Sequence, residues 1–191
     1  MNRREALKRV GLLLGGTVIS SQLFLTACST ENNGNRSNDS FLDSDVDLLN
    51  EIAETIIPET DTPGAKAAGV GSFMAMMVPD CYTEQNQENF RKGLEKVRSN
   101  FQKEYGKTFT EASVEERREF LNKLDSEMNT YTQIRHAKDP EHYFRIMKEL
   151  VLLGYFTSEI GCREARRYVQ TPGSYEACIE YEDGARAWMS P

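Results

Sequence analysis

The side chains that most often bind metals or act as nucleophiles and bases are scarce in this chain, which has two histidines and four cysteines. His136 and His142 lie among charged neighbours, and a lone imidazole needs an oriented partner to act as a general base. We therefore interpret both as surface residues. The spacings of Cys81, Cys162 and Cys178 are not typical of a zinc or iron–sulfur site. There is also no dinucleotide fingerprint and no phosphate loop.

The acidic residues have equally plain interpretations. The run from Glu115 to Glu119 predicts a solvated helix face. Glu159 is expected to pair with Arg163 or Arg166, because no second carboxylate is fixed opposite it for acid–base chemistry. With 23 Lys and Arg against 30 Asp and Glu in 191 residues, the formal charge is −7, so nucleic acid is not an expected partner. The sequence predicts no catalytic, cofactor or metal site on this chain.

The N-terminal residues are typical of an export signal. A basic start precedes a short apolar stretch, residues 10–25, which is too short and too polar for a good membrane span. The adjacent Arg3 and Arg4 resemble the twin-arginine signal, the alternative being a general secretory signal with chance arginines. We expect residues 1–27 to be the signal peptide.

A lipid anchor and a tether are predicted to follow the signal. Leu25-Thr26-Ala27-Cys28 resembles the bacterial lipobox, in which the cysteine is lipidated and becomes the first mature residue. Such an anchor attaches a protein to a membrane without a spanning helix. Residues 29–40 contain no apolar side chain, so residues 28–40 are predicted to be a lipidated flexible tether. We expect a periplasmic, membrane-attached lipoprotein.

Residues 41–191 are predicted to form one compact all-α domain of about five helices with an extended, irregular C-terminal tail. Apolar residues recur at helical spacing from Val46 to Ile57, with Asp43 or Ser44 as the cap and Pro58 as the end. A second segment is expected to run from Pro63 to Pro79.

Three further helices complete the predicted domain. The third spans residues 90–105, and the fourth follows a capping box formed by Ser113 and Glu116. The last is expected to start at Asp139-Pro140 and to continue through residue 156. Because it is apolar all round, it is predicted to be the central and most buried helix.

The tail carries the aromatic residues that commonly anchor interfaces. Turns at Pro172-Gly173 and at residues 182–184 flank Tyr175 and Tyr181, and Trp188 is the single tryptophan. Such a segment packs either on its own domain or on a partner, for which Trp, Tyr and Arg are the usual anchors. Both alternatives stay open at this point.

Several stretches together resemble the gluconate 2-dehydrogenase subunit 3 family, the small subunits of membrane-bound flavin-dependent sugar dehydrogenases. They are LNEIAETIIP (49–58), TDTPGA (60–65), LGYFTSEIG (153–161) and PGSYEAC (172–178), followed by Trp188. The resemblance spans residues 48–188. Twin-arginine export is also typical of that family, whereas many members lack the lipobox.

The resemblance implies an accessory subunit that is not an enzyme by itself. Its partner would be a large subunit of the glucose–methanol–choline (GMC) oxidoreductase type, which binds FAD and oxidises a sugar or sugar acid. A cytochrome c subunit often accepts the electrons. The small subunit would bind no cofactor, stabilise the flavoprotein and guide its twin-arginine export. The alternative is a stand-alone lipid-anchored periplasmic binding or scaffold protein.

Three cysteines remain once Cys28 is assigned to lipid, an odd count for an oxidising compartment. The resemblance is strong around Cys178, which favours a covalent link from this residue to the large subunit. The competing prediction is an internal Cys162–Cys178 bridge that leaves Cys81 free.

Overall fold

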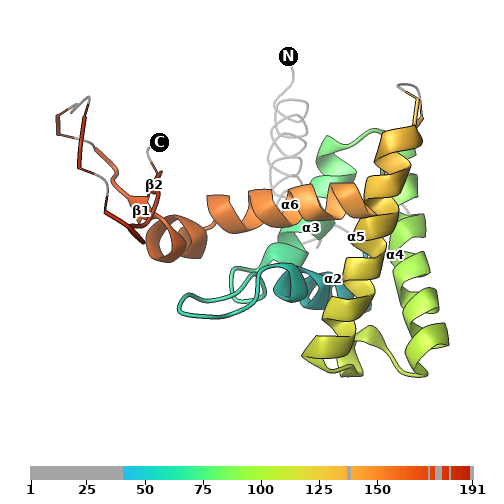
Figure 1. Ribbon diagram of the computed structural model, residues 1–191. Helices are drawn as coiled ribbons and strands as arrows, with labels where there is room; N and C mark the ends of the chain where they lie inside the picture. The colour runs from blue at the N-terminus through green and yellow to red at the C-terminus, as the bar shows by residue number, and fades with distance from the viewer. Residues whose placement is uncertain (1–40, 137–138, 172, 175–177, 181, 190–191) are drawn as a thin grey trace, which may run out of the picture. The chain divides into compact units, whose positions relative to one another are not determined.

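The computed structural model describes residues 41–136, 139–171, 173–174, 178–180 and 182–189 (Figure 1). The predicted signal and tether, with Arg3, Arg4 and Cys28, lie outside the described residues, as do Tyr175 and Tyr181. The predicted all-α fold is confirmed. The described elements are α2 (Asp43–Ile56), α3 (Val70–Cys81), α4 (Glu84–Tyr105), η1 (Phe109–Glu111), α5 (Val114–Ile134), α6 (Tyr143–Thr157), η2 (Gly161–Ala165), β1 (Arg167–Tyr168) and β2 (Trp188–Met189).

Helix α6 is central, as its composition predicts, because it packs against α2, α3, α4 and α5 (Figure 1). Tyr155, Met147 and Val151 are among its buried side chains. The expectation of burial all round is wrong at one place: Leu152 and Leu153 are 46% and 47% exposed. None of the helices in the described ranges is both long enough and apolar enough to cross a bilayer.

Two glycines allow α6 to approach its neighbours closely. A Cβ atom on Gly93 of α4 would lie 2.2 Å from the Tyr143 ring, and one on Gly154 would lie 2.6 Å from the Phe73 ring. Real Cβ atoms do not come so near, so both positions require the absence of a side chain. At each of these two contacts, an aromatic ring occupies the space that a side chain at the glycine position would need.

An aromatic cluster joins α4 to α5. The Phe101 ring stacks on Tyr105 at 4.5 Å and meets the rings of Phe109 and Phe120 edge to face, at 4.9 Å and 5.2 Å between centroids. Such pairs contribute about 0.5–1.5 kcal/mol each beyond their buried area. The contact between Phe101 and Phe120 thus joins α4 to α5.

Predicted boundaries of three helices are corrected by the structure. The N-cap of α2 is Leu42 rather than Asp43 or Ser44, and its backbone N–H donates to the Asp45 carboxylate at 3.0 Å. The second helix begins at Val70, because the chain before it turns and reaches Gly69 in the left-handed conformation, at φ 69°. Its end also differs, since Pro79 lies inside the last turn of α3.

The start of α6 is the third correction. The helix begins at Tyr143 rather than at Asp139-Pro140, and His142 is its N-cap. The capping box before α5 is confirmed: the Ser113 N–H donates to Glu116 at 2.8 Å, and the Glu116 N–H donates to the Ser113 hydroxyl at 3.4 Å. Sequence patterns located the helices well, but a histidine cap falls outside the residue types that predict helix starts.

Candidate functional site

The loop of residues 58–69 is held by one carboxylate from the preceding helix. Glu54, in the last turn of α2, accepts the backbone N–H of Glu59 and that of Lys66, each at 2.8 Å. A Cβ on Gly64 would lie 2.3 Å from this carboxylate, so a side chain there would displace the Glu54 carboxylate from its present position. A single side chain thus binds the loop at residues 59 and 66.

A second anchor comes from α6. The buried Tyr155 hydroxyl donates to the Pro63 carbonyl oxygen at 2.8 Å and lies 3.5 Å from the Thr62 hydroxyl. The stretches 49–58, 60–65 and 153–161, which are far apart in sequence, consequently meet at one place. The backbone N–H of Ala65 also donates to the Ile57 carbonyl at 2.9 Å.

An ion-pair cluster also stabilises the same loop. Glu51 of α2 binds Lys66 at 2.5 Å and also binds Arg117 of α5. Arg117 donates further to the carbonyl oxygens of Phe109, at 2.8 Å, and Thr110, at 2.6 Å. Both Glu51 and Arg117 are largely buried, with side chains 15% and 13% exposed. Their contacts join α2, η1 and α5 to the loop.

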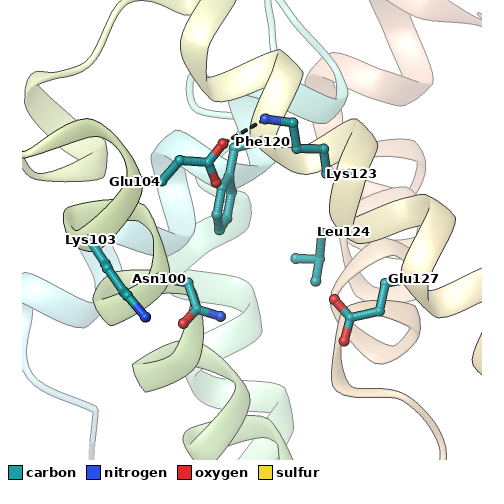
Figure 2. A pocket seen from close by; sticks show the side chains of 7 residues that line it. All are labelled: Asn100, Lys103, Glu104, Phe120, Lys123, Leu124 and Glu127. Carbon is teal, nitrogen blue, oxygen red and sulfur yellow. Dashed lines mark hydrogen bonds and ion pairs between the residues drawn. The ribbon is translucent and has the colours of Figure 1, made fainter.

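A groove of about 430 Å³ lies between α4 and α5 (Figure 2). Phe120 and Leu124 form its apolar floor, and Lys123 reaches across it to Glu104 at 2.5 Å. The hydrogen bond to Glu104, with a second to Glu119, raises the pKa of the Lys123 ammonium. The groove therefore has a lining that is partly apolar and partly charged. Its remaining lining residues are Asn100, Lys103 and Glu127.

The two histidines differ in environment. His136 is exposed, as predicted. The prediction is wrong for His142, whose side chain is only 9% exposed and whose Nδ1 accepts the Phe144 N–H at 3.3 Å. Burial lowers its pKa below 6.5, although Glu127 opposes this shift. The unprotonated ring thus serves as a helix cap.

The three described cysteines are free thiols. Cys81 and Cys178 are exposed, and Cys162 is half-buried with its thiol donating to the Phe156 carbonyl at 3.4 Å. The internal Cys162–Cys178 bridge and the link from Cys178 to a partner both stay predictions. No group of three or more His, Cys, Asp or Glu side chains in the described ranges is arranged to hold a metal ion.

The tail forms a small two-stranded parallel sheet in which Arg167 lies opposite Trp188 and Tyr168 opposite Met189. Trp188 is 53% exposed, with the Arg167 guanidinium 4.0 Å from its ring centroid. Of the predicted interface residues, Trp188 is thus presented at the surface. The predicted pairing of Glu159 is confirmed with Arg163, at 2.9 Å.

Sequence reasoning missed the roles of Glu54 and Tyr155. A signal for the first exists: an acidic residue in the last turn of a helix opposes the helix dipole, so a carboxylate there points to a specific partner. For Tyr155 no such signal exists, because its carbonyl acceptor belongs to Pro63, distant in sequence. Every residue has a backbone carbonyl, so the amino-acid sequence does not indicate which carbonyl will accept this hydrogen bond.

Comparison with known proteins gives one match. No curated protein and no solved structure matched the chain. The sequence profile described as gluconate 2-dehydrogenase subunit 3 matches residues 43–173. That range contains every described helix, the 58–69 loop and both of its anchors. The chain therefore belongs to the gluconate 2-dehydrogenase subunit 3 family, whose members are subunits of a dehydrogenase complex.

Proposed function

We propose that this chain is the non-catalytic small subunit of a periplasmic, membrane-associated, FAD-dependent dehydrogenase of a sugar or sugar acid. The large subunit, of GMC type, would bind FAD and oxidise the substrate, with a cytochrome c subunit as electron acceptor. The observation that carries the proposal is the family match over residues 43–173. This chain would bind no cofactor of its own.

The contacts of three carboxylates on α2 support a structural role. Glu54 is bonded to two backbone N–H groups, Glu51 to Lys66 and Arg117, and Asp45 to Arg98 at 2.6 Å. Each of these groups is engaged in holding one segment of the chain to another. A general acid or base must instead face a space where substrate can reach its proton.

The N-terminal signal supports a role in export. The twin-arginine route carries folded cargo, which suits a protein whose cofactor is inserted before export. Arg3 and Arg4 would direct this chain and a bound, FAD-loaded partner to that route together, and lipidated Cys28 would then attach the complex to the membrane. The partner would need no signal of its own.

Removal of residues 1–27 tests the export function. In a strain background in which the full chain exports the flavoprotein, we expect the truncated chain to leave the flavoprotein in the cytoplasm. The double variant Arg3→Lys, Arg4→Lys should have the same effect, whereas the matched variant Arg9→Lys should not. Cys28→Ala should leave export intact and release the complex from the membrane. Normal export of the flavoprotein without residues 1–27 would contradict the proposal.

A further inference from the structure

The chain after α6 carries an exposed pair of residues on a short but well-defined support. The Arg167 N–H donates to the Ala187 carbonyl at 2.9 Å, and the Val169 N–H donates to the Met189 carbonyl at 3.3 Å. These bonds attach β2 to β1, which follows directly after η2. A pair of two-residue strands is marginal by itself, so side chains must add to its stability.

Arg166 supplies that stability on one side. Its guanidinium lies 4.3 Å from the Phe156 ring centroid, and its Nη1 donates to the Met189 sulfur at 3.2 Å. It therefore connects the end of α6 to β2. Because successive residues of an extended chain point to opposite sides, Arg167 is directed away from this contact.

Arg167 is exposed and stacks on the exposed Trp188 ring, at 4.0 Å. Neither Arg166 nor Arg167 forms an ion pair with a carboxylate in the described part of the chain, whereas Arg163, a few residues earlier, binds Glu159. The Arg167 side chain thus contacts the Trp188 ring, and its guanidinium N–H groups have no carboxylate acceptor in the described part of the chain. A guanidinium matches a carboxylate, which accepts two parallel N–H bonds.

We propose that Arg167 and Trp188 form the anchor by which this chain binds the larger subunit of its dehydrogenase complex. This inference rests on the proposed function. Trp188 would enter an apolar pocket of the partner, and a partner carboxylate would receive Arg167. Arg166 is a positioning residue that holds β2 in place. Trp and Arg are the residue types that contribute most to binding at the centre of interfaces.

Charge favours a protein partner over a lipid surface. An Arg–Trp pair also suits a membrane interface, but anionic lipid is typically recognised by a cluster of several basic residues, and a chain with a formal charge of −7 carries no basic excess. A partner carboxylate, in contrast, complements the one basic group that the stacked pair exposes. The occupant we infer is thus an acidic site beside an apolar pocket on the large subunit.

Capture of the full chain from detergent-solubilised membranes, with co-purified flavin as the readout, tests the anchor. We expect Arg167→Ala and Trp188→Ala each to lower the captured flavoprotein at least tenfold. Arg167→Lys should lose most of the binding, because it keeps the charge but not the two parallel donors. Trp188→Phe should retain more than Trp188→Ala. Thermal unfolding of the helical domain should match that of the wild type in each variant, since both side chains are exposed and lie in the tail rather than in the core.

Arg145→Ala and Ile134→Ala are matched controls, because Arg145 is a surface arginine and Ile134 is 72% exposed, both away from the tail. Both should bind like the wild type. Equal capture by wild type and anchor variants would overturn the anchor and leave the proposed function standing. No capture by the wild type would overturn both. On a Cys28→Ala background, residual membrane attachment that the anchor variants abolish while they keep the flavoprotein would show that the pair faces lipid, which also overturns the anchor.

Discussion

The hydroxyl of Tyr155 on α6 donates a hydrogen bond of 2.8 Å to the carbonyl oxygen of Pro63. This bond ties the central helix to the 58–69 loop, which Glu54 holds from the other side. The family-like segments 60–65 and 153–161 carry no evident catalytic group, and this hydrogen bond gives them a shared structural role. Together they fix the conformation of the 58–69 loop.

Removing the tyrosine hydroxyl should loosen that loop without unfolding the domain. We expect Tyr155→Phe to lower the free energy of unfolding by about 1 kcal/mol, because the Pro63 carbonyl loses its donor. Trypsin should then cut faster after the exposed Lys66. Tyr168→Phe, which alters a tyrosine 39% exposed in β1, is the control and should change neither quantity. Unchanged cleavage in Tyr155→Phe would show that the bond does not hold the loop.

Glu54 should matter more than Tyr155, because it accepts two hydrogen bonds as a charged group. Glu54→Ala is expected to lower the free energy of unfolding by about 2–3 kcal/mol, less the small gain from removing an acid near a helix C-terminus. Glu59→Ala, at an exposed position in the same loop, should have no measurable effect. Urea denaturation of both variants decides the matter, and equal midpoints would contradict this account of the loop.

The close approach of α4 to α6 predicts a cost for a single methyl group. Gly93→Ala should lower the free energy of unfolding by about 1–3 kcal/mol, since the new Cβ overlaps the buried base of the Tyr143 ring. Helix propensity alone predicts the opposite, a gain of about 1 kcal/mol. Ser99→Ala, exposed on the same helix, reports that propensity without a clash. A thermal melt showing Gly93→Ala to be stabilised would refute the packing.

Stability should fall in mild acid because of His142. Burial lowers the pKa of its imidazole below 6.5, while Glu127 raises it and Lys96 lowers it. The rings of Tyr131 and Tyr143 face the same imidazole, at 5.5 Å and 4.5 Å. The unfolded chain therefore binds a proton at a higher pH than the folded chain. The stability from the neutral cap is complete above pH 6.5 and is lost as the pH falls toward the lower, folded pKa.

His142→Asn isolates this effect, because asparagine caps helices without titrating in this range. The difference between the unfolding midpoints of variant and wild type, measured from about pH 7 to about pH 5, should shift in favour of the variant. The exposed His136→Asn serves as the control and should not alter the pH dependence. If the wild-type midpoint instead rises relative to that of His142→Asn on acidification, the predicted role of His142 is wrong.

Helical periodicity and the Ser113 capping box predicted the described helices and the central place of α6. The start of α3 was missed because the segment from Pro63 is apolar enough for a helix, yet its backbone N–H groups are taken by Glu54 and the Ile57 carbonyl. The exposure of Leu152 and Leu153 was missed because composition shows how apolar a helix is but not which neighbours cover it. Pairings across long sequence distances, such as that of Tyr155 with Pro63, depend on the assembled fold.

The central claim is that this chain serves as a cofactor-free subunit that binds a flavoprotein. Purification of the chain with and without its large subunit, followed by flavin absorbance and sugar-dependent dye reduction, tests it most directly. The account predicts flavin and dehydrogenase activity in the complex and neither in the chain alone. Flavin bound to the isolated chain, or oxidation of a sugar by it, would contradict the account.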